Sequence, residues 1–361
     1  MFQKFIKKIK KLYKIKIIFD LPKKNNLLLY DEIHSSVLRK IIKRDFNIFK
    51  TREIEIYFWI FIKQIIFFDF RFKTYSRNYI EYTSPKIIIS FNDIKNNFYE
   101  LKDFFKNITF ISIQNGLHDE ADFKNYFKSR KLKCDHIFVV NKHYIKEYKK
   151  LIKSKYHILG RFSNNIVKVK KTTIFNKFLL ISQFEEKIGR VGNFYKKLMS
   201  PLNLYFSNSN KKLHILLRRK DSLGQKKEIE FYKNFFQSNC VFHKTSKWKK
   251  SYEILDKFEN IIFMHSTLGY EAISRKKKVA VFSPKKIVHC NYWFGWPAPF
   301  QKKYNYFSAK NLSYSEIKRV LNNVYSCNQT NWEKKYYGAI EGLIIINKDN
   351  SKLKKVISAS L

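Results

Sequence analysis

Short apolar runs alternate with amphipathic segments along most of this chain, most clearly in its last third. There the apolar run Ile261–Met264 precedes the polar turn His265–Thr267, an amphipathic segment, a basic turn and a second apolar run, Lys278–Phe282. This order predicts a βαβ unit whose helix is capped by Ser266 or Thr267. The amide groups that start such a helix lie at the carboxyl end of a parallel strand, where α/β sheets bind phosphate. The pattern therefore predicts a site for a phosphorylated ligand.

The same alternation covers the rest of the chain. Further strands are expected at residues 26–30, 47–50, 86–90, 108–113, 136–140, 156–159, 178–182, 213–217 and 241–243. Helices are expected at residues 35–43, 54–68, 75–83, 143–152, 191–199, 228–237, 252–257 and 313–325, and another ends near Phe105. Strands that alternate with helices form parallel sheets with helices on both faces. The predicted fold is therefore α/β, with two Rossmann-like, doubly wound parallel-sheet domains that face one another across a cleft.

A length of 361 residues suits two domains better than one. We expect a basic extension at residues 1–25, a first domain at 26–165, a second domain at 166–340 and a frayed tail at 341–361. The polar tract Ser163–Asn176 is the expected linker. Ser313, with Glu316 three residues later, has the spacing of a capping box. Helix is expected to resume over residues 331–347.

The formal net charge is +44, which suggests nucleic acid or an anionic membrane as a partner. Lysine is spread over the whole length, without zinc-finger spacing or an aromatic ribonucleoprotein motif, so nucleic acid is the weaker candidate. A bias toward AT-rich codons, which enriches Lys, Asn, Ile, Phe and Tyr together, explains the same composition without a function.

The N-terminal sixteen residues are typical of a helix that lies in a membrane interface. One helical face carries the apolar residues Phe2, Phe5, Ile6, Ile9, Leu12 and Tyr13. The alternative is an extension that packs this stripe on the protein itself. The apolar run 56–68 is too short to span a bilayer and is expected to be a buried or surface-lying helix. With no secretory signal and no CxxC pair, we expect a cytoplasmic protein, peripheral at the inner face of the cytoplasmic membrane.

Six segments resemble, in chain order, the surface-carbohydrate (lipopolysaccharide and capsule) biosynthesis proteins of bacteria. They are NLLLYDEIHSSVL, PKIIISFNDIKNNFYEL, ISIQNGLHDE, DHIFVVNKHYIKEY, ILGRFSNN and HSTLGYEAISRKKKVAVFS. The similarity covers most of residues 26–335. It implies a glycosyltransferase-B-like (GT-B-like) fold, and the last segment is similar to the donor-site segment of many transferases with that fold. A nucleotide sugar is then a substrate, and no cofactor is expected.

On this resemblance the second domain binds the donor. Ser266, Thr267 and Gly269 would hold the phosphate through hydroxyl and backbone N–H groups, and the chain would pass close to the ligand at the glycine. Glu271 would accept hydrogen bonds from ribose hydroxyls. The alternatives are a plain helix cap for the two hydroxyl residues and a solvated helical carboxylate for Glu271. His265 is either a donor contact or a turn residue.

Arg218 and Arg219 follow a predicted strand in LHILLRRKD. Planar guanidinium groups suit the phosphates of a leaving nucleotide, and because strand neighbours face opposite ways, one of the two is expected to enter the cleft. Surface ion pairs are the alternative. The turn Gly189–Gly192 is a weaker candidate for an anion site. Asn291–Phe300 is expected either to stack on a base or sugar or to pack as a hydrophobic loop.

Sugar transfer to a hydroxyl group requires a general base, which we expect from the first domain. The candidates are His118, Asp119 and Glu120, which follow a predicted strand. Acceptor contacts are expected where three strands end, at Asp31, Asn92, Asp93, Gln114, Asn115 and Gly116. A turn or capping role is the alternative, especially for Asp93 and Asp119.

Several chemistries are disfavoured by missing motifs. The sequence has no Asp-x-Asp, so no metal site is expected, and it has no GxxxxGK, GxGxxG or GxSxG. The hypothesis is a metal-independent glycosyltransferase that extends a bacterial surface polysaccharide or lipopolysaccharide. Two alternatives stay open: a nucleotide-sugar 2-epimerase of the same fold, and a non-catalytic basic protein that binds membranes or nucleic acid.

Overall fold

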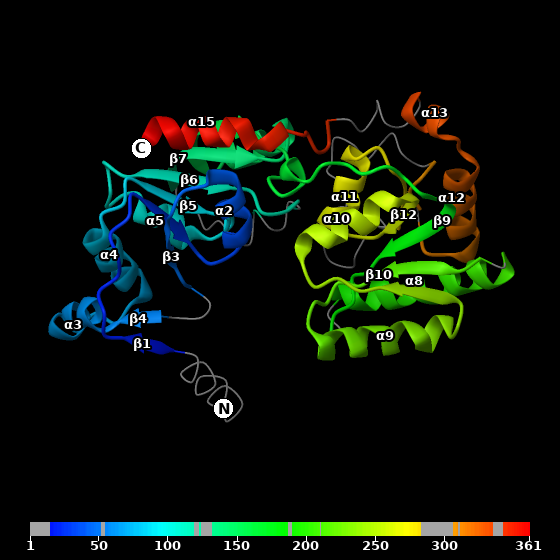
Figure 1. Ribbon diagram of the computed structural model, residues 1–361, viewed down its shortest axis with the longest axis horizontal. Helices are drawn as coiled ribbons and strands as arrows, with labels where there is room; N and C mark the ends of the chain where they lie inside the picture. The colour runs from blue at the N-terminus through cyan, green and yellow to red at the C-terminus, as the bar shows by residue number, and fades with distance from the viewer. Residues whose placement is uncertain are drawn as a thin grey trace. The chain divides into compact units, whose positions relative to one another are not determined.

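The computed structural model describes residues 15–51, 55–118, 123, 132–186, 190–209, 211–282, 306–309, 311–334 and 342–361. The chain forms two structural units, and each has its own parallel sheet (Figure 1). Unit 1 comprises residues 1–116, 122–166 and 347–361, and unit 2 comprises residues 117–121 and 167–346. Within the described ranges, every helix is too short or too polar to span a bilayer.

Unit 1 is built on a six-stranded sheet in the order β3-β2-β5-β6-β7-β8, with every pair parallel. Its strands are β2 (Leu27–Tyr30), β3 (Asn47–Phe49), β5 (Ile87–Ser90), β6 (Thr109–Ile113), β7 (Leu132–Val139) and β8 (Ile152–Ile158). The central strands are continuous buried apolar runs because both faces of a parallel sheet are covered. The strand order reverses between β2 and β5, which makes their carboxyl ends a topological switch point.

Unit 1 also contains helices and a second, two-stranded sheet. The helices of unit 1 are α2 (Ser35–Ile42), α3 (Phe58–Ile66), α4 (Phe72–Thr83), α5 (Asn96–Leu101), α7 (Lys142–Lys149) and α15 (Ser351–Ser360), with the short 3-10 turns η1 (Asn164–Ile166) and η4 (Lys348–Asn350). The small sheet pairs β1 (Lys16–Ile18) with β4 (Glu55–Tyr57). The helix expected at residues 54–68 therefore starts later than predicted, because β4 occupies its first residues.

Unit 2 has a five-stranded parallel sheet in the order β11-β10-β9-β12-β13. Its strands are β9 (Ile174–Ile181), β10 (Leu213–Leu216), β11 (Cys240–His243), β12 (Phe258–Phe263) and β13 (Lys278–Val281). Its helices are α8 (Arg190–Asn208), α9 (Ser222–Phe236), α10 (Trp248–Lys257), α11 (Thr267–Ser274), α12 (Tyr314–Ser326) and α13 (Gln329–Trp332). Here the strand order reverses between β9 and β12. The expected fold class of two Rossmann-like, parallel-sheet domains is confirmed.

Three local expectations differ from the structure. The C-terminal residues form α15, which buries Leu353 and Ile357 in unit 1, rather than a frayed tail. The helix expected over residues 331–347 does not extend to residues 342–347, which are not helical. The start of the expected linker is buried, because Asn165 Nδ2 donates to Leu159 O at 2.9 Å and to Asn350 Oδ1 at 2.8 Å. Half of the predicted capping box of α12 is present, since Ser313 Oγ accepts from Glu316 N–H, whereas the Ser313 N–H donates to Asn311 Oδ1 at 2.9 Å.

Each sheet carries a pair of histidines on neighbouring strands. His214 Nδ1 lies 3.0 Å from His243 Nε2, and His136 Nδ1 lies 2.9 Å from His157 Nε2. Burial lowers the pKa of all four imidazoles, and it lowers the pKa of His214 to about 4. Neutral imidazole is therefore the form that the folded sheets accommodate.

We predict that acid destabilises the fold through these pairs. The pKa of His214 is lower in the folded protein than its ordinary value of 6.5, so the unfolded chain binds more protons between these pH values. The stabilising contribution is complete above about pH 6.5 and is lost as pH falls toward 4. Between pH 6.5 and pH 4, denaturant unfolding should show that His214→Phe loses less free energy of unfolding than wild type does, by roughly 1–3 kcal/mol. If the free energy of unfolding fell equally with pH in the two proteins, the role given to His214 would be wrong.

Candidate functional site

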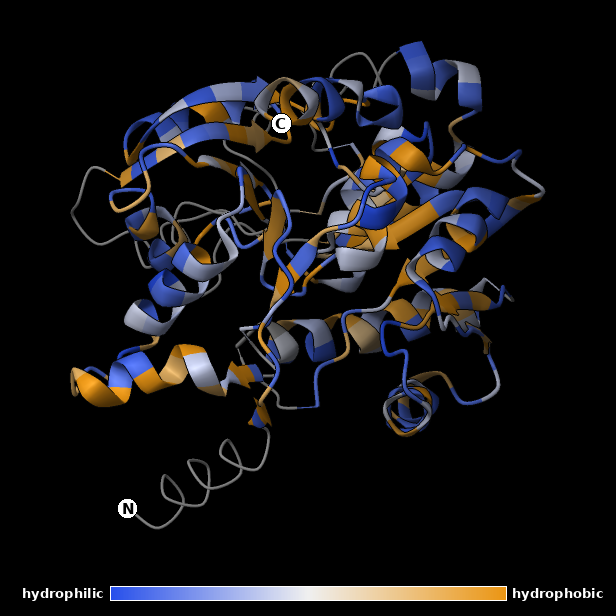
Figure 2. Ribbon diagram, turned by 60° about the vertical axis from the view of Figure 1, so that its left-hand side comes forward, coloured by the Kyte–Doolittle hydropathy of each residue, from blue (hydrophilic) through white to orange (hydrophobic). Residues whose placement is uncertain are grey.

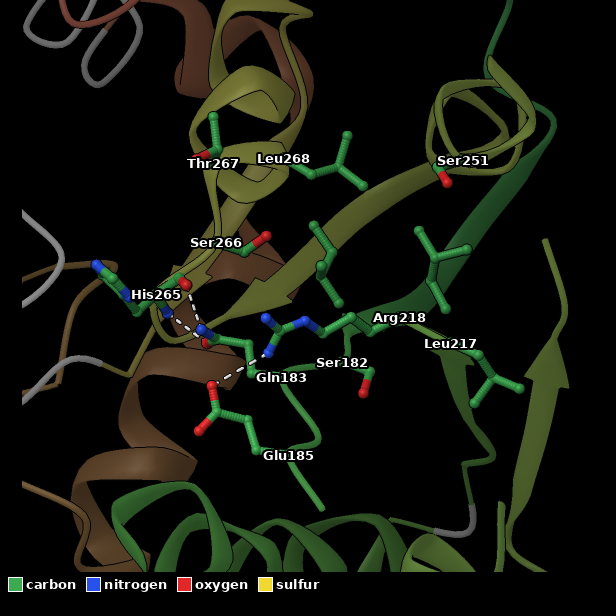
Figure 3. A pocket seen from close by; sticks show the side chains of 12 residues that line it. Ser182, Gln183, Glu185, Leu217, Arg218, Ser251, His265, Ser266, Thr267 and Leu268 are labelled. Carbon is green, nitrogen blue, oxygen red and sulfur yellow. Dashed lines mark hydrogen bonds and ion pairs between the residues drawn. The ribbon is translucent and has the colours of Figure 1, made fainter. Parts of the chain in front are cut away.

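A pocket of about 540 Å³ lies at the carboxyl edge of the unit 2 sheet, at its switch point (Figure 3). The loops that follow β9, β10 and β12 contribute most of its wall, and α10 adds one residue. The lining residues are Ile181, Ser182, Gln183, Glu185, Leu216, Leu217, Arg218, Ser251, His265, Ser266, Thr267 and Leu268. Ligands of doubly wound sheets bind at such a place, where helices leave neighbouring strands toward opposite faces.

Gln183 joins the two strand ends that flank the switch point. Its Oε1 accepts the backbone N–H of His265 at 2.5 Å, and its Nε2 donates to the carbonyl of the same residue. Both bonds appear as dashed lines in Figure 3. The Gln183 side-chain amide thus binds the backbone N–H and carbonyl of His265 in the way a neighbouring strand would, and it fixes the turn into α11. No feature of the sequence marked Gln183 as a site residue.

The start of α11 faces the pocket without a side-chain cap. Ser266 is the N-cap residue by its backbone angles, but its hydroxyl makes no capping hydrogen bond. Ser266 and Thr267 both line the pocket, so a plain capping role does not describe this serine. The first amide groups of a helix have no acceptor within the helix, and the helix dipole makes that end positive. The geometry suits an anion.

Arg218 lines the same pocket, whereas its neighbour is engaged elsewhere. Arg218 Nη1 lies 3.3 Å from Glu185 Oε1 in a half-exposed ion pair. Arg219 forms ion pairs with Glu186 at 3.6 Å and with Asp221 at 3.4 Å. Of the two arginines expected at this strand end, Arg218 therefore lines the pocket and Arg219 does not.

Glu228 is a buried residue of α9 that sequence reasoning missed. Its Oε1 accepts the backbone N–H of Arg218 and its Oε2 accepts that of Arg219, each at 2.9 Å, and the Ser182 hydroxyl also donates to Oε1. Burial raises the pKa of this carboxyl above 4.5, while these hydrogen bonds oppose the rise. In the sequence it is one of many helical glutamates. The only sequence feature that connects Glu228 with the site is its position ten residues after Arg218.

The structure gives Gly269 a packing role, and the close approach to a ligand that the sequence suggested stays a prediction. A Cβ at this position would lie 2.2 Å from the Phe263 ring, so the glycine allows α11 to pack against β12. Glu271 is 2% exposed, so the alternative of a solvated helical carboxylate is wrong. It is also not among the residues that line this pocket. Its contact with a ribose remains a prediction.

We predict that Gly269→Ala destabilises unit 2 by about 1–3 kcal/mol, because an added methyl group overpacks the helix–strand contact. Gly342→Ala is the matched control, since a Cβ there meets no atom within 4 Å. Thermal or denaturant unfolding of the two variants provides the comparison. If both variants unfold like wild type, the packing role of Gly269 is wrong.

In unit 1, the polar residues that end β2 and β5 bind one another. The buried Asp31 carboxylate accepts from Thr51 Oγ1 at 3.0 Å and from Asn92 Nδ2 at 3.2 Å. Asp31 also has a left-handed backbone, with φ of 83°. These bonds hold the loops at the switch point of the first sheet.

Two further acceptor-side candidates are also buried. Asp93 Oδ1 accepts the Asn115 N–H at 3.1 Å and its Oδ2 accepts from Tyr148, so the predicted alternative of a turn role describes it. Gln114 binds Val140 N–H and donates to Gly116 O at 2.7 Å. Asp93 and Gln114 therefore shape the loops and are not exposed to an acceptor.

The half-buried side chains of this edge are the accessible ones. In unit 1 they include those of His34, Asn92 and Asn115. His118, which was expected to be part of the first domain, is also half-buried but belongs to unit 2. His34 was not predicted: its Nε2 lies 2.6 Å from Asn115 Oδ1, and its ring packs on Phe162. A single histidine in a loop, four residues after the end of a strand, carried no signal in the sequence.

Some predicted site residues lie outside the described residues. They are Asp119, Glu120, Gly189 and Asn291–Phe300. Of the proposed anion turn, the structure describes Arg190–Gly192 as the start of α8.

A family model described as "putative O-antigen biosynthesis protein" matches residues 110–360. This chain belongs to that O-antigen biosynthesis family. The expected kinship with surface-carbohydrate biosynthesis proteins is confirmed. No curated protein matches the chain.

Several solved structures share the fold. A glycosyltransferase from Rickettsia africae is 10% identical, with 94% of this chain and 99% of that chain covered and a TM-score of 0.51. S. aureus MnaA, solved with UDP, is 10% identical, with coverages of 93% and 96% and a TM-score of 0.56. A UDP-GlcNAc 2-epimerase from Neisseria meningitidis, bound to UDP-GlcNAc, is 12% identical, with coverages of 92% and 98% and a TM-score of 0.53. At these identities the likeness establishes a GT-B-like fold.

Proposed function

We propose that this member of the family is a glycosyltransferase that moves a sugar from a nucleotide-sugar donor to a bacterial surface polysaccharide or lipopolysaccharide. The observation that carries the proposal is the unit 2 pocket, which combines Arg218 with the uncapped start of α11. Membership of an O-antigen biosynthesis family supports the product class. The likeness to folds solved with UDP or UDP-GlcNAc supports the ligand class.

The donor diphosphate would bind between the two positive groups of the pocket. Backbone amides at Thr267 and Leu268 would donate to one phosphate, and the Arg218 guanidinium would bind the other. The Arg218–Glu185 ion pair is half exposed, so it is worth at most about 1 kcal/mol and exchanges readily for a phosphate. A volume of about 540 Å³ is suitable for a nucleotide-sized ligand.

In the proposed reaction, an acceptor hydroxyl attacks the anomeric carbon as the bond to the diphosphate breaks. Arg218 and the helix amides stabilise the negative charge that develops on the leaving nucleotide, without a metal ion. The proton of the acceptor passes to a base among His118, Asp119 and Glu120. The acceptor is a glycan or glycolipid, and the enzyme is cytoplasmic and peripheral at the inner face of the cytoplasmic membrane.

We expect nucleoside diphosphates to raise the melting temperature of the wild-type protein, because a ligand that binds only the folded state stabilises it. Arg218→Ala should weaken binding by about 10-fold to 100-fold, since it removes a charge-assisted contact. Arg219→Ala is the matched control and should retain binding. A thermal-shift titration with UDP, CDP and GDP measures both. Equal responses of the two variants would refute the placement of the diphosphate.

Product analysis distinguishes transfer from epimerisation, which proteins of this fold also perform. We expect wild-type protein incubated with the bound nucleotide sugar and no acceptor to leave the sugar unchanged. Added surface-glycan acceptor should yield an extended glycan and a free nucleoside diphosphate. An isomerised nucleotide sugar would instead support the epimerase. No reaction and no nucleotide binding would favour the non-catalytic binder.

A further inference from the structure

The exposed apolar side chains of the described surface are concentrated in one part of unit 1. Nine of the 17 large hydrophobic residues that are exposed belong to residues 17–21 and 59–70, whereas the others are scattered. We call these nine the aromatic surface: Ile17, Phe19, Leu21, Trp59, Ile65, Ile66, Phe67, Phe68 and Phe70. Single exposed apolar residues are ordinary, but a cluster of this kind marks an interaction site.

The two segments of the aromatic surface are neighbours in space. β1 pairs in parallel with β4, and β4 continues directly into α3. The rings of Phe19 and Phe58 lie 5.2 Å apart, which joins the residues after β1 to the first turn of the helix. In Figure 2, α3 is largely orange, and it lies near β1 and β4 in Figure 1. The two segments therefore meet at the start of α3.

The turn that ends α3 is firmly built, although its rings face water. Buried Gln64 donates from Nε2 to Asp69 O at 2.7 Å and to Arg71 O at 3.0 Å. These bonds display Phe67 and Phe68, which are 78% and 83% exposed. Phe68 also has a left-handed backbone, with φ of 48°, which is unfavourable for a bulky residue. Packing among the described residues of unit 1 leaves both rings uncovered, and uncovered aromatic rings that lie together are typical of an interaction site.

The charges around the aromatic surface are predominantly positive. The two segments of the surface contain two carboxylates: Asp20 is exposed between Phe19 and Leu21, and Asp69 is bound by Arg71 at 2.8 and 2.6 Å. These hydrogen bonds lower the pKa of Asp69 and keep its charge paired with that of Arg71. Lys63 and Lys16 are exposed beside the apolar residues. The fourteen residues that precede Ile15 in the sequence add six lysines and no carboxylate.

We propose that the aromatic surface docks unit 1 on an anionic lipid bilayer. Aromatic and aliphatic side chains enter the interface, while the lysines bind lipid phosphates. A second copy of this chain is a poorer occupant, because each copy has a formal net charge of +44 and would repel the other. The surface belongs to unit 1 and the nucleotide pocket to unit 2, so this inference does not depend on the proposed reaction.

The test is sedimentation of the full-length protein with phosphatidylcholine vesicles, with and without phosphatidylglycerol. We expect wild type to bind the anionic vesicles. The double variant Phe67→Ser/Phe68→Ser should bind them at least about tenfold more weakly, because two inserted rings are lost. The matched control is Phe175→Ser/Leu223→Ser, which replaces two residues of unit 2 that are 57% and 63% exposed. It should bind like wild type.

A second measurement locates the contact without altering the phenylalanines. Brominated lipids should quench wild-type tryptophan fluorescence more than that of Trp59→Phe, since Trp59 is 54% exposed on α3. Unchanged unfolding midpoints would show that the variants are folded. Equal vesicle binding by wild type and the double phenylalanine variant would overturn the proposal. So would a wild-type dimer in analytical ultracentrifugation that this double variant converts to monomer, because the surface would then be a self-association interface.

Discussion

The candidate site depends on the bridge between Gln183 and the backbone of His265. At the switch point between β9 and β12, the following helices leave in different directions, and the strand ends would otherwise part. The Gln183 side-chain amide binds both the backbone N–H and the backbone carbonyl of His265, which follows β12. The turn into α11 is thereby held with its uncapped amides toward the pocket. The backbone amides at the start of α11 thus form an anion site, and the guanidinium of Arg218 adds a positive charge to it.

Beneath the pocket, a buried polar network supports the loop that carries the arginines. Tyr232 donates to Ser182 Oγ at 2.7 Å, its hydroxyl lies 2.5 Å from that of Tyr195, and Ser182 in turn donates to Glu228. Because polar groups without partners are costly inside a protein, each member stabilises the position of the next. The carboxylate then fixes the backbone of Arg218 by accepting its N–H. Arg218 therefore extends from a rigid base, while its guanidinium stays half exposed.

Local pattern predicted most of the sheets and part of the site. Runs such as Ile87–Ser90 and Ile261–Phe263 are apolar because parallel strands are buried on both faces, so they were visible in the sequence. Strand ends then indicated Arg218, Ser266 and Thr267. The pairing of β1 with β4 was not predictable, because three-residue strands far apart in sequence leave no periodic signal. Gln183 and Glu228 were missed for a related reason: their roles arise from tertiary contacts.

The most direct test of the central claim is a crystal structure of the full-length protein with the nucleoside diphosphate that stabilises it most. We expect a diphosphate bound within hydrogen-bonding distance of the amides of Thr267 and Leu268 and of the Arg218 guanidinium, with the Gln183–His265 bridge intact. A nucleotide bound away from the β9–β12 switch point, with this pocket empty, would contradict it.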